Sequence, residues 1–302
     1  MSSTVEQAAA AVPAVGIVPP APEARGRVLP TFSFAVGVLL VLGPLVASFV
    51  ARIFVSRHGT LLFAYQGVLK PSSTHVLGTD AQGRDVLASI VYGIVPTFEI
   101  GLLAGLVGVC VGTVLGVVSG YFGGLVDSAI RGVADVMLGI PPFALLVVIA
   151  ALWGSLSVIW LGVAIALLSW PLPARAIRAQ ILSLREQGFV VMSRLSNRNA
   201  ASIMFLEILP NMLPYVTATF VGLVSGGLLT AIGLELLGLG PVGIITLGSM
   251  LQSALTFGAI SQGIWWWWAA PTVLLVLLFL GLFLLSLSVD RISNPRLAGT
   301  RG

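Results

Sequence analysis

Six mostly apolar stretches of membrane-spanning length constrain the fold of this 302-residue chain more than any other feature. The hydrocarbon core of a bilayer is about 30 Å thick, a distance that a helix of about twenty residues crosses. The stretches lack the period-two alternation of β-strands, which favours helices over a closed barrel. The chain is 57% hydrophobic, and a soluble domain of this length could not bury that much apolar surface. The sequence therefore predicts an all-α membrane protein.

The six predicted spans divide the chain into three regions. They cover residues 32–54, 98–118, 134–153, 158–172, 214–237 and 266–287, and the third is kinked at Pro141-Pro142. Residues 1–30 are predicted to be a disordered cytoplasmic tail, 31–290 the transmembrane domain with its core at 75–290, and 291–302 a second cytoplasmic tail. In the long loop after the first span, Asp80 is expected to cap a separate helix that lies against the outer membrane surface or the bundle.

The distribution of basic residues predicts the orientation. With the N-terminus inside, 11 of the 15 Lys and Arg residues fall in inner segments and 4 in outer segments. Basic residues are concentrated in cytoplasmic loops, so both termini should be cytoplasmic. The loop at 170–211 alone holds five arginines, in a chain of which only 9% is charged. This loop is expected to meet a soluble partner.

A stripe of glycines at a spacing of mostly four residues marks the second span. Its members are Gly101, Gly105, Gly108, Gly112, Gly116, Gly120 and Gly124. Glycines on one helix face let two backbones approach closely, which is how helices associate in lipid. We expect Gly105, Gly112, Gly116 and Gly120 to form a tight seam with another span or subunit. General glycine enrichment in membrane helices is the alternative.

The sequence argues against catalysis and nucleotide binding in this chain. Both histidines, His58 and His75, fall in the outer loop and have no metal-ligand partner at helical spacing. Lys70 is the only lysine and is followed by Pro71, so no phosphate-binding loop is present. The basic residues are not gathered in a soluble domain, which argues against nucleic-acid binding. We predict no cofactor or metal, and any ATP that drives the protein would be hydrolysed by another subunit.

Three acids fall within the predicted spans, where ionisable side chains are usually functional. Glu99 is a candidate path residue or a side chain that reaches the interface. Asp135 is expected to pair with Arg131, four residues earlier. Glu235, beside glycine-rich sequence, is a candidate gate residue or a structural hydrogen-bonding group.

Four consecutive tryptophans begin the sixth span: Trp265, Trp266, Trp267 and Trp268. Tryptophan is typical of the headgroup level of a bilayer, which is one interpretation. Successive residues of a helix point in different directions, so at least one should face the bundle. An indole there could stack on a sugar ring or a peptide side chain, which makes all four candidates for the substrate path.

Four segments together resemble one family of permeases. They are HVLGTDAQGRDVLASIVYG, VSGYFGG, SWPLPARAIRAQILSLREQGFV and EILPNMLPY. Over about residues 75–290 the chain is similar to the permease of dipeptide, oligopeptide and nickel ABC importers. The resemblance implies six transmembrane helices of the type I importer architecture, in a prokaryotic inner or plasma membrane. It also implies a homologous second permease, two cytoplasmic ATPases that bind ATP and Mg, and an extracytoplasmic solute-binding protein.

In that family the loop between the fourth and fifth spans carries a coupling helix that docks into the ATPase. The matching stretch here has Val191 in place of the family's glutamate and Asn197 in place of its glycine. Asparagine is the residue after glycine that best adopts the left-handed conformation, so the turn should persist. The resemblance assigns ATPase coupling to Phe189, Met192, Arg194, Leu195, Ser196 and Asn197.

The cargo is open at the level of sequence. The general family transports peptides, whereas AIGLELLGLG followed by the tryptophan run resembles a branch that imports oligosaccharides. Nickel is a further family cargo. A passive channel and a membrane scaffold without an ATPase are the alternatives outside the family; a channel would need polar rings along its pore.

Overall fold

The computed structural model describes residues 32–154 and 156–293, and within these ranges the chain is built from helices and loops. The first half contains α1 (Phe32–Ala51), the short η1 (Arg57–Thr60), α2 (Val86–Phe122), α3 (Gly124–Gly139), α4 (Pro142–Trp153) and α5 (Val158–Ser169). The second half contains α6 (Pro171–Leu184), α7 (Gly188–Leu195), α8 (Ala200–Ser202), the π-helical η2 (Ile203–Ile208), α9 (Leu209–Leu236), α10 (Leu247–Thr256) and α11 (Trp265–Ser293). The predicted tails at 1–30 and 294–302 lie outside the described residues, and α11 continues past the predicted boundary at 290.

Four helical stretches of the described chain are long and apolar enough to cross a membrane by themselves: Phe32–Ala51, Val86–Phe122, Ala200–Leu236 and Trp265–Val289. Two bent helix pairs raise the number to six if each pair is one span. The α3–α4 pair bends by 78° at the predicted Pro141-Pro142 kink, and the α5–α6 pair bends by 46° just before Pro171. Proline lacks the N–H that would continue the helical ladder, which places both breaks. The protein is therefore an all-helical, multi-pass membrane protein.

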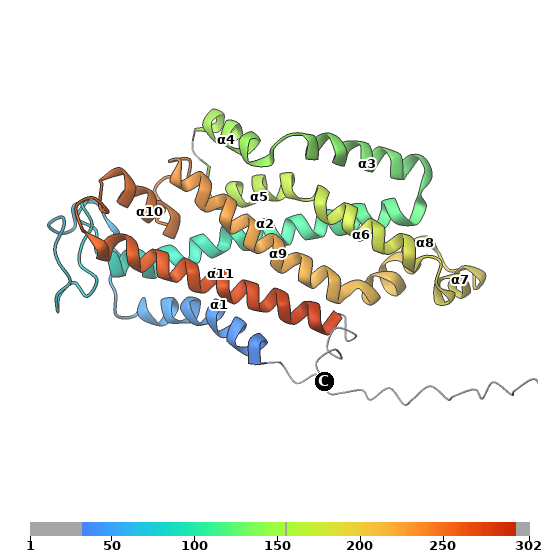
Figure 1. Cartoon of the computed structure of the whole chain (residues 1–302), viewed down its shortest axis with the longest axis horizontal. Helices are drawn as coiled ribbons and strands as arrows, with labels where there is room; N and C mark the ends of the chain where they lie inside the picture. The colour runs from blue at the N-terminus through green and yellow to red at the C-terminus, as the bar shows by residue number, and fades with distance from the viewer. Residues whose placement is uncertain (1–31, 155, 294–302) are drawn as a thin grey trace, which may run out of the picture.

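The long helix α2 is the centre of the bundle. It packs most extensively against α5, α6 and α9, while α1 packs along α11 at one side (Figure 1). The α3 and α4 segments extend along the opposite side, where α3 contacts α2 and α6. A movement of α6 or α9 would therefore act on α2 through direct contacts.

The helix predicted after Asp80 is present and packs against the bundle, but it is not separate and Asp80 does not cap it. Residues from Val86 onward instead form the first turns of α2, which continues through Pro96 to Phe122. Asp85 caps this helix, because its Oδ1 accepts a hydrogen bond from the Ala88 N–H at 2.9 Å. Of the two predicted positions for its apolar face, the outer membrane surface or the bundle, the structure shows the bundle, where the face packs into a core cluster with α10 and α11. Burial of that face offsets the single hydrogen bond lost at the proline.

The glycine stripe on α2 lies against other helices of the same chain. Added Cβ atoms would meet α9 side chains at Gly105 and the α5–α6 segment at Gly112 and Gly116. At Gly116 such an atom would lie 2.7 Å from the Ala174 carbonyl oxygen and 3.0 Å from the Ile177 Cβ. Gly120 makes a similar approach to Ile181. These contacts form an intrachain seam that leaves no room for a methyl group at Gly116.

The bundle has two distinct ends. The α7 end carries α7, the start of α8 and the last turn of α2, and α1 begins and α11 ends toward the same side (Figure 1). The loop end carries residues 52–85 and α10 (Figure 1). This placement puts the two candidate sites described next on opposite sides of the membrane-spanning region.

Candidate coupling helix and the cavity at the opposite end

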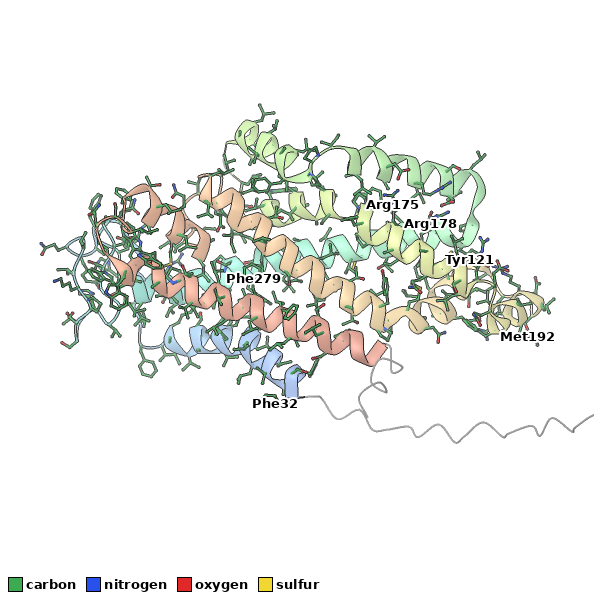
Figure 2. All side chains as sticks on the ribbon, in the orientation of Figure 1. Phe32, Tyr121, Arg175, Arg178, Met192 and Phe279 are labelled. Carbon is green, nitrogen blue, oxygen red and sulfur yellow. The ribbon has the colours of Figure 1, made fainter. Side chains whose placement is uncertain are left out.

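Helix α7 is held to the bundle by one buried residue and presents an apolar surface outward. Val190 is fully buried in a cluster with Ile181 of α6 and Ile203 of η2. In contrast, 63% of Met192 and 77% of Leu195 is exposed, and Met192 lies at the far tip of the molecule (Figure 2). Helix α7 therefore presents large apolar side chains on its exposed face, outside the candidate spans.

The C-terminus of α7 closes in the left-handed turn that the sequence predicted. Asn197 has φ +57°, one of few positive values outside glycine in the described chain. Its N–H donates to the Arg194 carbonyl at 3.0 Å, and the Arg198 N–H donates to the Ser193 carbonyl at 3.2 Å. These two bonds form a Schellman motif, which normally has glycine at the left-handed position. The left-handed turn predicted at Asn197 is therefore present.

Glu207 ties α7 to the helix that follows it, and sequence reasoning missed this residue. It accepts a hydrogen bond from the Ser193 hydroxyl and one from the Arg198 guanidinium at 2.7 Å. Only 14% of the Glu207 side chain is exposed. Position 191 is a valine, and the acid that contacts the end of α7 is Glu207 of η2. No sequence spacing signals the pair, because the turn at Asn197 brings the two elements together.

A groove of about 550 Å³ lies between α7 and the start of α9. Of the six residues predicted for coupling, Phe189, Met192 and Ser196 line it. Leu195 is exposed outside the groove, Asn197 closes the turn, and Arg194 lies over the Tyr121 ring at 5.1 Å. The further lining residues are Ser193, Arg198, Leu206, Glu207, Pro210 and Asn211.

A buried ion-pair cluster joins α2, α3 and α6 near the α7 end. Asp127 accepts two hydrogen bonds from the Arg178 guanidinium, at 2.5 and 2.6 Å, and one from the Ser119 hydroxyl at 2.5 Å. Arg131 approaches the same carboxylate at 3.3 Å. Two parallel bonds between a guanidinium and a carboxylate fix orientation as well as distance. Figure 2 shows Arg178 in the space between α3 and α6.

The predicted Arg131–Asp135 pair is wrong. Arg131 pairs with Asp127 instead, and Asp135 pairs with Arg175 of α6 at 3.0 Å. Both members of the Arg175 pair are more than half exposed, whereas Asp127 is 10% exposed. The helix periodicity allowed either partner for Arg131, and packing of α6 against α3 selected between them.

The acids that were candidates for the path are placed very differently. Glu235 is 2% exposed and lies against Gly240 and Gly248, so it packs between α9 and the start of α10. Its carboxylate faces the Thr246 side chain and the backbone N–H groups of Gly248 and Ser249 at the start of α10. Glu99 is exposed on α2. No cavity described here is lined by either residue.

The tryptophan run serves mainly to pack the loop end. Trp266 and Trp267 are 7% and 1% exposed, and the Trp266 indole N–H donates to the Thr79 carbonyl at 3.3 Å. Trp268 packs against the same core, while Trp265 is 58% exposed. Two of the four rings are thus unavailable for stacking on cargo in this conformation.

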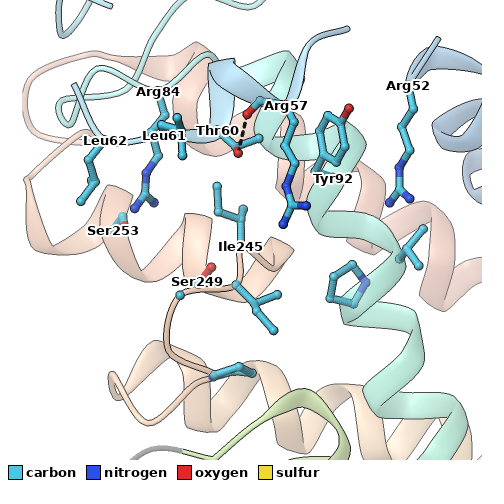
Figure 3. A pocket seen from close by; sticks show the side chains of 15 residues that line it. Arg52, Arg57, Thr60, Leu61, Leu62, Arg84, Tyr92, Ile245, Ser249 and Ser253 are labelled. Carbon is cyan, nitrogen blue, oxygen red and sulfur yellow. Dashed lines mark hydrogen bonds between the residues drawn. The ribbon is translucent and has the colours of Figure 1, made fainter. Parts of the chain in front are cut away.

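The loop end contains a cavity of about 850 Å³. Its walls come from residues 52–62, Arg84, the start of α2, the loop after α9 and α10 (Figure 3). Asp80 supports this wall, because its Oδ1 accepts hydrogen bonds from the N–H groups of Gln82 and Arg84, each at 2.8 Å. Burial raises the pKa of the Asp80 carboxyl above its usual value. Within the described residues, no group of three His, Cys, Asp or Glu side chains could hold a metal ion.

The described chain is a helical bundle in which the short helix α7 lies between the fourth and fifth candidate membrane-crossing units. Residues 112–299 match the family described as the binding-protein-dependent transport system inner membrane component, and the chain belongs to this family. Its fold is that of the type I importer permeases. The family indicated by the sequence is therefore confirmed.

Three curated relatives show the extent of the similarity. The glutathione transport system permease protein GsiD of Pectobacterium atrosepticum is 32% identical over 56% of this chain and 56% of its own length. The dipeptide transport system permease proteins DppC of Alkalihalophilus pseudofirmus and Haemophilus influenzae are 34% and 35% identical, over 56% and 61% of this chain and 56% and 62% of their lengths. The chain thus matches between half and two thirds of the length of these relatives.

Proposed function

We propose that this chain is the membrane-spanning subunit of an ATP-driven importer for short peptides. Family membership supports the permease role, and the names of the relatives, which refer to dipeptide and glutathione transport, support a peptide cargo. The burial of Trp266 and Trp267 removes two of the rings that favoured an oligosaccharide. The complete importer would add a homologous second permease, two ATPases and an extracytoplasmic solute-binding protein.

The observation that carries this proposal is the geometry of α7. An eight-residue helix exposes Met192 and Leu195 while Val190 anchors it, and a closed turn and Glu207 fix its far end. Such a helix suits insertion into a cleft of an ATPase. The arginines around it are typical of a cytoplasmic surface, so the α7 end would face the cytoplasm and the loop end the outside.

Force applied to α7 has two routes into the bundle. One runs through the short link at 185–187 into α6, which is locked to α3 by Asp127 and Arg178. The other runs through Glu207 into η2 and α9. Both α6 and α9 pack on α2. ATP-driven closure of the ATPases would therefore shift the balance between two arrangements of the bundle, open to opposite sides of the membrane.

The turn at Asn197 provides the test. Asn197→Gly keeps the left-handed conformation accessible, whereas a β-branched residue there is strained, by about 1–2 kcal/mol. In reconstituted complexes with the partner subunits, Asn197→Ile should uncouple ATP hydrolysis from uptake while Asn197→Gly retains coupling. The measurement is peptide uptake and the stimulation of ATPase activity by the loaded binding protein.

Four results would contradict the proposal. Full coupling in Asn197→Ile would remove α7 from the transmission route. Uptake without ATP would indicate a passive channel. Failure to isolate any ATPase with the chain in mild detergent would indicate a scaffold. Uptake of oligosaccharides but no peptides would show that the cargo is a sugar.

A further inference from the structure

Three arginines line the cavity at the loop end. Arg52 follows α1, Arg57 begins η1, and Arg84 precedes α2, yet all three line the same space. Figure 3 shows their side chains extending toward it from the surrounding backbone. They are three of the four basic residues that the sequence analysis placed on the extracytoplasmic side. Basic residues are concentrated in cytoplasmic loops, so the rule that sets orientation does not account for this cluster. Their shared position therefore indicates a local role.

None of these guanidinium groups forms a direct ion pair in the described chain, although Arg84 lies near enough to the buried Asp80 carboxyl to interact with it electrostatically. The ion pairs between described residues involve other arginines or His75. The Nε atoms of Arg52 and Arg84 are also buried without a hydrogen-bond partner among these residues. Buried polar groups are normally satisfied, so unpaired buried donors on a cavity wall indicate a group that arrives from outside. Arginine donors favour carboxylate or phosphate oxygens.

The remaining wall defines the rest of that ligand. It is largely apolar, with Leu61, Leu62, Val95, Pro96, Ile244 and Ile245, and α10 contributes the hydroxyls of Ser249 and Ser253. No acidic residue lines the cavity. The nearest acid along α2 is the exposed Glu99, one helical turn beyond Pro96, outside the lining. The cavity, at about 850 Å³, is in the range of small-molecule sites, which run from about 300 to 1,000 Å³. This chemistry fits a small anion with an apolar body.

The arginines are positioned before any ligand arrives. The Arg52 guanidinium lies 5.1 Å from the ring centres of both Phe49 and Tyr92. The Tyr92 hydroxyl in turn donates to the Val55 carbonyl at 3.1 Å, which ties the ring to the segment before Arg57. Arg84 is placed by the Asp80 turn. Groups held in place in advance lose less freedom on binding.

We propose that this cavity receives the C-terminal carboxylate of a peptide as the cargo leaves the binding protein. The inference rests on the proposed peptide import and adds the chemical group by which the permease itself recognises cargo. The arginine wall attracts and binds the carboxylate through Arg57 and Arg84, Arg52 adds positive charge to the same wall, and the apolar wall and the two serines contact the adjoining residues. A neutral sugar would leave the three charges unpaired.

The test compares free-acid peptides with their C-terminal amides. The complete importer, with its binding protein, is reconstituted in liposomes and given a mixture of peptides of two to five residues in both forms, and the imported peptides are quantified by mass spectrometry. Binding of each form to the isolated binding protein is measured separately. In the permease that carries both Arg57→Gln and Arg84→Gln, we expect the ratio of free-acid uptake to amide uptake to fall about tenfold. This is equivalent to about 1.4 kcal/mol.

Lys70→Gln is the matched control, because it removes one positive charge from an exposed position of the same outer loop that does not line the cavity. It should leave the uptake ratio unchanged. Arg84→Lys, which keeps the charge, should restore part of the preference. The ratio of N-acetylated to free-amine peptides should be the same in all variants, because the site reads the other end of the peptide.

The outcomes separate this inference from the proposed function. Peptide uptake with an unchanged acid-to-amide ratio in the arginine variants would overturn the carboxylate site and leave peptide import standing. Loss of the second permease from the purified variants would overturn it in favour of a subunit contact. An equal loss of uptake for both peptide forms would also overturn it. Absence of peptide uptake by the unmodified importer would overturn both proposals.

Discussion

Arginines at the two ends of the bundle are used in opposite ways. At the α7 end, Arg175 and Arg178 of α6 form ion pairs with carboxylates of α3, and Arg198 forms one with Glu207 of η2. At the loop end, Arg52 and Arg84 line a cavity and have no such partner among the described residues. The same side chain therefore joins helices at one end and is left available at the other.

This difference between paired and unpaired arginines indicates which end of the bundle is held rigid and which end is available for binding. A charge that is paired inside the protein fixes the geometry of two elements and cannot bind anything else. A charge without an internal partner retains its attraction for an incoming anion. An importer that receives force at one end and cargo at the other would need this division. The following changes test it, beginning with the largest expected effect.

Asp127→Asn should break the paired end most severely. The change leaves the partly buried guanidinium of Arg178 without its carboxylate, and breaking a buried pair by removing one partner costs about 3–5 kcal/mol. Because 22% of Arg178 is exposed, we expect the lower end, about 3 kcal/mol. Thermal unfolding of the purified protein in detergent, followed by circular dichroism, measures the loss.

Asp135→Asn is the control for that experiment. Its pair with Arg175 is more than half exposed on both sides, and exposed pairs contribute about 0–1 kcal/mol. Equal destabilisation by the two substitutions would show that the buried cluster has no special role at the α7 end.

Gly116→Ala should loosen the seam that carries α6 on α2. The added methyl group would lie 2.7 Å from a backbone carbonyl oxygen, which cannot move aside as a side chain can. Overpacking of this kind costs about 1–3 kcal/mol. The same thermal unfolding measures it. Gly132→Ala, where an added Cβ meets nothing within 4 Å, should be neutral or stabilising, and destabilisation there would contradict the steric explanation.

Of these substitutions, Glu207→Gln should change the free energy of unfolding least, and its main effect should be on the coupling of ATP hydrolysis to transport. Arg198 is 56% exposed, so loss of its charged partner should cost at most about 1 kcal/mol. A change of that size alters the ratio of two arrangements of α7 about fivefold, which should weaken the stimulation of ATPase activity by cargo. Glu186→Gln, which removes the exposed partner of Arg185, is the matched control. Unaltered stimulation in Glu207→Gln would show that α7 does not act through η2.

Local features were predictable from the sequence where residues within a single segment set the backbone conformation. The break at Pro141-Pro142 follows from the missing proline N–H, and the turn at Asn197 follows from the preference of asparagine for positive φ. The partner of Arg131 was not predictable, because Asp127 and Asp135 are equally spaced from it along the helix. The helix start was misjudged for the same reason: Asp80 and Asp85 both suit a cap, and only packing distinguishes them.

The sequence by itself determined that this protein is a helical membrane protein, because apolar length, glycine spacing and proline position act along one helix at a time, and its motifs indicated the permease family by resemblance. Only the tertiary structure decided which charges are paired. Glu207 meets Arg198 across a turn, and Arg52, Arg57 and Arg84 share a cavity although separate segments carry them. Electrostatic interactions depend on distance in space, which the order of residues along the chain does not specify.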